Sequence, residues 1–226
     1  MRLGGAQNIQ RPDTARVINE NPFNGLDVGA IDALNSLEIV SGAISKFRPD
    51  PQLQKPQALS RPSAVLIGLF QSTKGVEVIL TRRSHQLTNH RGEISFPGGR
   101  LDEGETVIAA ALRETQEEIG INPSEAQVIA ELSAMSTVVS NSHIVPIVAR
   151  FEQRPEMRPM NSEVDRVFTV PLSELARTDT YSQEYWKFSD RELRINFFYL
   201  DDETIWGATA RMLLQVMNLT LNLKTN

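Results

Sequence analysis

Three glutamates crowd one side of a single predicted helix. Apolar residues recur at three- and four-residue spacing between about Thr106 and Ile119, which predicts a helix there. At about 100° per residue, Glu114, Glu117 and Glu118 are neighbours on its flank. Like charges at this spacing repel one another, and the C-terminal end of a helix disfavours acids. A divalent cation would reverse that repulsion, because ions such as Mg²⁺ are held by a few carboxylate oxygens.

Three glutamates alone would fit an ordinary solvated helix face equally well. The residues around them favour a metal site instead. The stretch PGGRLDEGE precedes the helix, and its paired glycines let the backbone approach a ligand or metal closely. Gly120 fits the position just after the helix C-terminus. The apolar arc that we expect to be buried comprises Val107, Ile108, Ala111, Leu112, Thr115 and Ile119.

The spacing of these residues matches a known pattern. Gly99 is followed after five residues by Glu105 and, after seven more, by RETQEEIGI. This resembles the Nudix box, G-x5-E-x7-R-E-U-x-E-E-x-G-U, and only Thr115 departs from it, where a bulky aliphatic residue is usual. The resemblance implies an α/β fold, the Nudix α/β/α sandwich with a mixed β-sheet between helices. It also implies hydrolysis of a nucleoside diphosphate linked to another group, with Mg²⁺ or Mn²⁺ as cofactor.

The resemblance assigns roles to individual residues. Arg113 would orient the glutamates through salt bridges, and Glu105 would support them near the helix start. Water would be the nucleophile, and its general base would be Glu117 or the loop acid Glu163, although Glu163 is equally well read as a solvent-exposed acid. The metal ligands implied are Glu114, Glu117, Glu118 and a backbone carbonyl of Gly99 or its neighbour Gly98.

Substrate choice depends on the preceding stretch, ILTRRSHQLTNHRGEISFPGGR. It is similar to the extra motif of the coenzyme A diphosphatase branch, L-T-x-R-S-x3-R-x3-G-x3-F-P-G-G, with Thr88 in place of the basic residue. This resemblance implies cleavage of coenzyme A or acyl-CoA to (acyl-)phosphopantetheine and adenosine 3′,5′-bisphosphate. An arginine guanidinium can donate two parallel hydrogen bonds to phosphate oxygens. Each of these arginines, taken alone, could instead be an ordinary surface residue. The substrate-binding residues predicted are Arg82, Arg83, Ser84, His90, Arg91 and Arg100.

Two alternatives stay open at this point. Because Thr88 replaces the basic residue of the motif, another diphosphate substrate stays open, such as ADP-ribose, NADH or a damaged nucleotide. A non-catalytic ligand-sensing Nudix domain is the alternative of another class, and it is disfavoured because all three box glutamates are present.

The elements around the box alternate between strands and helices. β-Branched and aromatic runs predict strands over 64–70, 76–81, 93–96, 128–132, 144–151, 167–172 and 195–200, with a hairpin turn at Gly75 and a closing helix over 207–223. We assign residues 61–223 to the Nudix domain and 1–60 to an N-terminal extension with one helix, about Gly29 to Phe47, and a proline-rich linker. The extension is interpreted as an oligomerisation element of a homodimer or as a partly ordered tail.

Composition sets broad limits on function. The chain has 226 residues and 40% apolar content, enough for an ordinary core. Its formal charge of -5 argues against nucleic acid or an anionic membrane as a partner. No cysteine is present, which excludes thiolate chemistry. With neither a membrane-spanning run nor a secretion signal, we expect a cytoplasmic protein that binds a small-molecule substrate, although a weak transit peptide at the start stays open.

Overall fold

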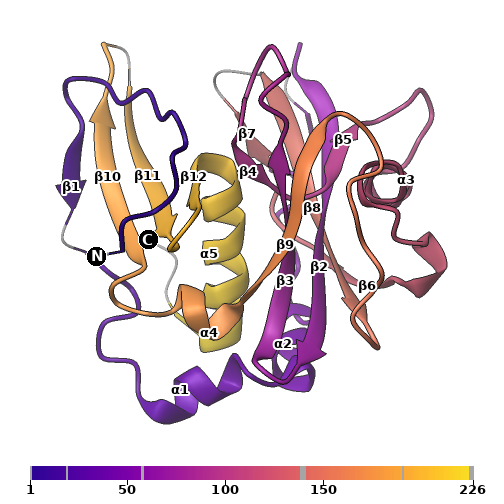
Figure 1. Cartoon of the computed structure of the whole chain (residues 1–226), viewed down its shortest axis with the longest axis horizontal. Coiled ribbons are helices and arrows are strands. Elements are labelled where there is room, and N and C mark those ends of the chain that lie inside the picture. Colours follow the sequence, from indigo (N-terminus) through magenta and orange to yellow (C-terminus); the bar gives the residue numbers. More distant parts are fainter. Residues whose placement is uncertain (1, 19, 57–58, 138–140, 190, 224–226) are drawn as a thin grey trace.

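The fold consists of two β-sheets with helices between and outside them (Figure 1). A computed structural model of the chain describes residues 2–18, 20–56, 59–137, 141–189 and 191–223. The small sheet lies on one side of helix α5 (Gly207–Leu221), the large sheet on the other, and helix α3 (Val107–Ile119) covers the far face of the large sheet (Figure 1). The large sheet therefore lies between helices, as predicted.

The large sheet is mixed. Its main strands run in the order β4-β3-β2-β8-β6, in which β2 and β8 are parallel and the other pairs are antiparallel. Three more strands attach to it: β5 to β2, β7 to β8 and β9 to β3. The strands are β2 (Arg61–Ser72), β3 (Gly75–Arg83), β4 (Ile94–Ser95), β5 (Gly98–Arg100), β6 (Gln127–Glu131), β7 (Met135–Ser136), β8 (Ser142–Phe151) and β9 (Val164–Pro171).

The small sheet joins the two ends of the chain. It has the order β1-β10-β11-β12 and is antiparallel throughout. The strands are β1 (Arg16–Ile18), β10 (Tyr181–Lys187), β11 (Glu192–Tyr199) and β12 (Thr204–Trp206). The predicted strand over 195–200 falls on β11, whereas β1, β10 and β12 were not predicted.

The single helix predicted from Gly29 to Phe47 is wrong. The structure has two helices there, α1 (Val28–Ala33) and α2 (Leu37–Ile44). Ser36 separates them, because its extended backbone and its side chain, which accepts a hydrogen bond from the Ile39 N–H at 3.4 Å, begin a new helix. The remaining helices are the short α4 (Leu172–Leu175) and the 3₁₀ turn η1 (Pro123–Glu125).

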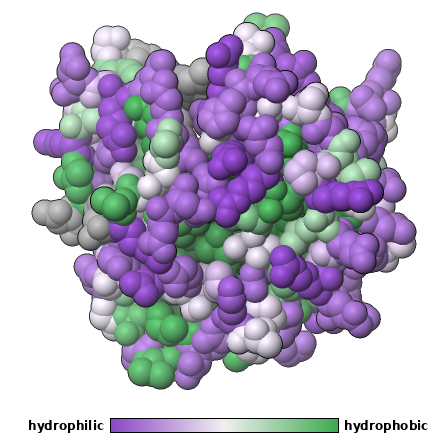
Figure 2. Space-filling view, viewed as in Figure 1, coloured by the Kyte–Doolittle hydropathy of each residue, from purple (hydrophilic) through white to green (hydrophobic). Residues whose placement is uncertain are grey.

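The first sixty residues contribute to the core. Phe23, Leu34, Val40 and Ile44 are buried in the same cluster as α5 and the facing side of the large sheet. The boundary at residue 60 stays a prediction, and residues 57 and 58 of the predicted linker lie outside the described residues. Much of the face in Figure 2 is hydrophilic, with a hydrophobic group at the lower left over α1. Within the described ranges, no helix is long and apolar enough to cross a membrane.

Candidate active site

Helix α3 is fixed at both ends. Thr106 begins it as predicted, and its side chain accepts from the Ala109 N–H at 3.2 Å. Gly120 ends it in the left-handed conformation, with φ of 79°. Within the arc predicted to be buried, the prediction for Ile108 is wrong, because this residue is 40% exposed. Val107, Ala110 and Ala111 pack against one hydrophobic cluster, so the packed face of the helix passes beside Ile108.

Glu118 is a buried carboxylate. Its residue is 4% exposed, and Oε2 accepts the Gly98 N–H at 3.1 Å. Burial raises the pKa of Glu118 to about 7, and the nearby charges of Glu114 and Glu163 act in the same direction. A buried anion with one backbone donor and two acidic neighbours is in an environment that favours positive charge.

Arg113 holds the remaining acids of the box. Its guanidinium donates to Glu105 Oε1 at 2.9 Å, to Glu114 Oε1 at 2.9 Å and to Glu117 Oε2 at 3.3 Å. It also donates to the carbonyl of Arg100 at 3.0 Å, which links the helix to β5. The hydrogen bond from Arg113 lowers the pKa of Glu105. This is the orienting geometry that the Nudix resemblance implies for Arg113.

The two glycines of β5 let its backbone lie close to β2 on one side and to the Glu114 carboxylate on the other. Gly98 has φ of +153°, and an added Cβ would collide with the Ala64 carbonyl oxygen of β2. An added Cβ at Gly99 would lie 2.5 Å from the carboxyl carbon of Glu114. The backbone of β5 therefore lies against the glutamates, where a carbonyl could join carboxylates around one ion.

The donor set fits a hard divalent cation. Burial also raises the pKa of Glu114, partly offset by its bond to Arg113. Across the described residues, no three acidic or histidine side chains already form a closed metal cage. In this arrangement the Arg113 guanidinium compensates Glu114 and Glu117. Glu118 is buried and forms no ion pair among the described residues, and carboxylate oxygens in such a group are the ligands that these ions prefer.

Glu163 and Arg83 lie beside the glutamates. Arg83 Nη2 is 3.8 Å from Glu163 Oε2, and the Ser84 N–H donates to the Glu163 carbonyl at 2.7 Å. Arg83 also opposes the rise in the pKa of Glu118, so its charge reaches that carboxylate. The Nε of Arg83 is buried and has no hydrogen-bond partner in the described part of the chain. Arg83 thus places a positive charge and a partly exposed guanidinium beside this site.

Arg82 points to the opposite face of the large sheet. Neighbouring residues of a strand alternate between faces, and Arg82 Nη1 donates to Glu203 at 3.0 Å. Glu203 is fully buried and also accepts from Arg166 at 2.7 Å. The structure therefore does not bring Arg82 together with the glutamates, and its role there is a structural ion pair.

The other predicted substrate-binding residues have different surroundings from one another. His90 Nδ1 lies 2.9 Å from Glu93, and this hydrogen bond raises the pKa of His90, while the charge of Arg83 opposes it. The Nε–H of Arg91 donates a hydrogen bond to the Leu87 carbonyl. Ser84 is buried and its hydroxyl accepts the Gln86 N–H at 3.2 Å, so it shapes a turn. Arg100 is exposed on β5, next to the glycines.

Asn161 was missed from the sequence. Its side chain donates to the Glu117 carbonyl at 3.3 Å and accepts the Glu163 N–H at 2.9 Å, so it joins the helix to the loop acid. An asparagine two residues before a predicted loop acid is a turn signal that could have identified it.

Comparison with known proteins identifies the family. The NUDIX domain family model matches residues 59–191, more than half of the chain. Nudix hydrolase 3 of Caenorhabditis elegans is 33% identical over 185 residues, covering 75% of this chain and 77% of the relative. Nudix hydrolase NudL of Photorhabdus laumondii is 33% identical over 182 residues, covering 77% of this chain and 96% of the relative. A MutT/nudix family protein from Enterococcus faecalis shares the fold, with a TM-score of 0.50 and 15% identity over 86% of this chain and 73% of that chain.

The chain belongs to the Nudix hydrolase family. It is accordingly an enzyme that hydrolyses phosphoric anhydride bonds in nucleoside diphosphate derivatives, and enzymes of this family generally use divalent metal cations.

Proposed function

We propose that the enzyme cleaves the diphosphate of coenzyme A or acyl-CoA, giving (acyl-)phosphopantetheine and adenosine 3′,5′-bisphosphate. The observation that carries this proposal is the position of Arg83, the arginine of the LTRRS stretch. Its Nη2 lies 3.8 Å from Glu163 Oε2, its charge opposes the rise in the pKa of Glu118, and its side chain is 28% exposed, so part of the guanidinium stays accessible. A guanidinium there can bind a phosphate oxygen of a substrate that carries more negative charge than the metals neutralise.

We propose Mg²⁺ or Mn²⁺ as the cofactor, held by Glu114, Glu117, Glu118 and the Gly99 carbonyl. When bound, such an ion neutralises diphosphate oxygens and makes a bound water a stronger nucleophile. Arg113 keeps Glu114 and Glu117 in place, and Gly98 fixes Glu118 through its N–H. Glu117 or Glu163 accepts the proton of the attacking water.

A second candidate is a Nudix hydrolase for another diphosphate, such as ADP-ribose or NADH. It is favoured by the loss of positive charge around Arg83, since Thr88 replaces a basic residue and Arg82 is held by Glu203. A homodimer and a cytoplasmic location stay predictions, to be tested by light scattering and by cell fractionation.

Incubation with a substrate panel tests the proposal. The purified protein with Mg²⁺ is given coenzyme A, ADP-ribose, NADH and nucleoside triphosphates, and the products are separated by chromatography. We expect adenosine 3′,5′-bisphosphate from coenzyme A as the main reaction. Intact coenzyme A beside a cleaved ADP-ribose or NADH would favour the second candidate, and no cleavage at all would favour the ligand-sensing alternative.

A further inference from the structure

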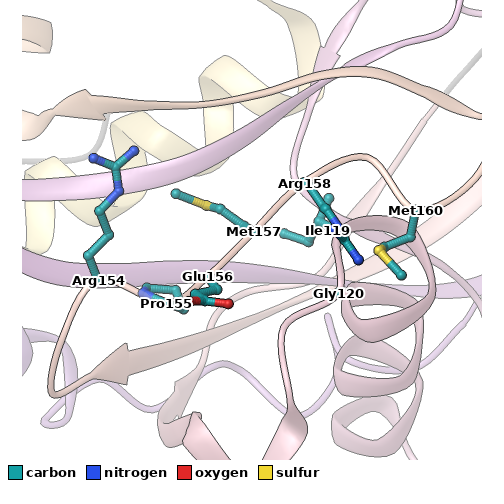
Figure 3. Close-up of a pocket in the computed structure, with 8 residues that line it drawn as sticks. All are labelled: Ile119, Gly120, Arg154, Pro155, Glu156, Met157, Arg158 and Met160. Atoms are coloured by element: carbon teal, nitrogen blue, oxygen red, sulfur yellow. The ribbon is translucent and has the colours of Figure 1, made fainter.

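A cleft lies at the C-terminal end of α3, outside the group of glutamates (Figure 3). Its volume is about 600 Å³, within the range of small-molecule sites. Ile119 from the helix and Met157 and Met160 from the loop between β8 and β9 give it an apolar lining. Met160 packs against Gly120, where an added Cβ would lie 3.2 Å from its sulfur.

The rim of the cleft is polar. Arg154 and Arg158 are both exposed and form no salt bridge within the described ranges, and the charge of Arg154 acts on Glu77 of β3. The N–H groups of Arg158, which lies beside Met157 and Ile119 in Figure 3, are therefore available to acceptors such as carbonyl or phosphate oxygens. Glu156, between them, offers an acceptor to N–H groups. The cleft thus combines donors, one acceptor and flexible apolar side chains.

The loop that lines this cleft also reaches the active site. The Arg158 N–H donates to the Ile119 carbonyl at 3.0 Å, and the Met160 N–H to the Glu118 carbonyl at 2.9 Å. Three residues after Met160 the same loop presents Glu163 beside Arg83. Three residues span at most about 10 Å. The cleft therefore lies within reach of a flexible group attached to a diphosphate at the glutamates.

We propose that this cleft binds the aliphatic, amide-bearing arm of the substrate, the part beyond the diphosphate from the nucleoside. For coenzyme A this is the pantetheine arm, with any acyl chain at its end, so the inference rests on the proposed function. Methyl and methylene groups fit against Met157, Met160 and Ile119. The arm's amide carbonyls accept from Arg158, and its amide N–H groups donate to Glu156.

Kinetics with matched substrates test the arm site. The double variant Arg158→Ala/Met160→Ser changes only side chains, so both backbone bonds to α3 remain. With coenzyme A we expect KM to rise about tenfold at unchanged kcat, because the arm is bound equally before and during reaction. With adenosine 3′-phosphate 5′-diphosphate, which lacks the arm, kcat/KM should stay within about twofold. The control is Arg211→Ala/Leu53→Ser, which removes the same charge and a similar apolar group from exposed positions elsewhere.

Direct binding gives a test that needs no turnover. Methionine methyl groups are labelled with ¹³C in the wild-type protein, and 4′-phosphopantetheine is added while the NMR signals of Met157 and Met160 are followed. We expect both signals to shift, and to shift less in Arg158→Ala.

The outcomes distinguish the two proposals. If coenzyme A is hydrolysed but the double variant affects both substrates equally, the arm site is wrong and the proposed function stands. If coenzyme A is not hydrolysed, the proposed function fails, and unchanged methyl signals would then overturn the arm site separately. A shift of those signals alone would support the cleft as a site for amide-bearing aliphatic ligands.

Discussion

At the scale of single residues, the carboxylate of Glu118 has an environment that disfavours its charge. It is buried, accepts one backbone hydrogen bond and faces two other acids. An unpaired buried charge lowers stability. The residue that we propose as a metal ligand is thus one that the fold tolerates poorly without a cation.

Replacing Glu118 with Gln should separate function from stability. The amide oxygen still accepts the Gly98 N–H, so the fold should persist, while nearly all turnover is lost with the metal ligand. We expect the metal-free variant to be more stable than the wild type by about 1–3 kcal/mol, because a buried charge is removed. Thermal unfolding with and without Mg²⁺ measures this. Mg²⁺ should raise the wild-type Tm more than that of the variant, and the exposed Glu125→Gln should behave as the wild type. Wild-type turnover in Glu118→Gln would contradict the metal site.

The general base can be identified by comparing Glu117→Gln with Glu163→Gln. Loss of the base should lower kcat about 10²- to 10⁴-fold without changing the Mg²⁺ concentration needed for half-maximal rate. Loss of a metal ligand should raise that concentration. Rates measured across a Mg²⁺ titration show which effect each variant has. If both variants keep wild-type kcat, neither acid is the base.

At the scale of elements, the site is a contact between one helix and one short strand. β5 brings Gly98 and Gly99 against Glu118 and Glu114, and β2 holds β5 in place. The loop from β8 to β9 binds the last carbonyls of α3 and adds Glu163. Carboxylate positions therefore depend on backbone spacing as much as on side-chain identity.

Adding one methyl group at Gly99 should test that spacing. In Gly99→Ala the Cβ would lie 2.5 Å from the Glu114 carboxyl carbon, so the carboxylate must move. We expect at least a tenfold loss of kcat with cooperative unfolding retained, measured by assay and circular dichroism. Gly42→Ala in α2 is the matched control, because an added Cβ there meets no atom within 4 Å. Equal activity of the two variants would show that the contact between β5 and Glu114 is not required.

At the scale of the whole molecule, the N-terminal sixty residues complete the core that supports the site. β1 pairs with β10. Phe23 is 2% exposed and packs against Tyr181 and Phe198, with ring centroids 5.4 and 6.4 Å away. These contacts favour an integral segment over a partly ordered tail.

Truncating Phe23 should therefore destabilise the enzyme. We expect Phe23→Ala to lower the free energy of unfolding by about 3–5 kcal/mol, the usual cost of removing a buried aromatic ring. Urea denaturation followed by fluorescence measures it. Val28→Ala, at a position that is 76% exposed, should stay within about 0.5 kcal/mol of the wild type. A similarly small effect of Phe23→Ala would support the partly ordered tail instead.

The sequence by itself determined the family, the helix α3 that carries the three glutamates, and most strands of the large sheet. These depend on local pattern: the periodic apolar face of α3, its capping residues Thr106 and Gly120, and the β-branched runs of β2, β3 and β8. The alternating polar and aromatic residues of β10 gave a weaker signal, and very short strands such as β12 gave almost none.

Only the tertiary structure decided which side chains meet. Arg82 and Arg83 are adjacent and chemically identical, yet the alternation of strand β3 places one against Glu203 and the other beside Glu163. The tertiary structure also decided the position of Asn161 and the presence of the cleft beside α3. Both depend on the loop between β8 and β9, whose path the local sequence does not specify. Types and spacing define the chemistry available to a chain, whereas long-range packing selects the groups that take part in it.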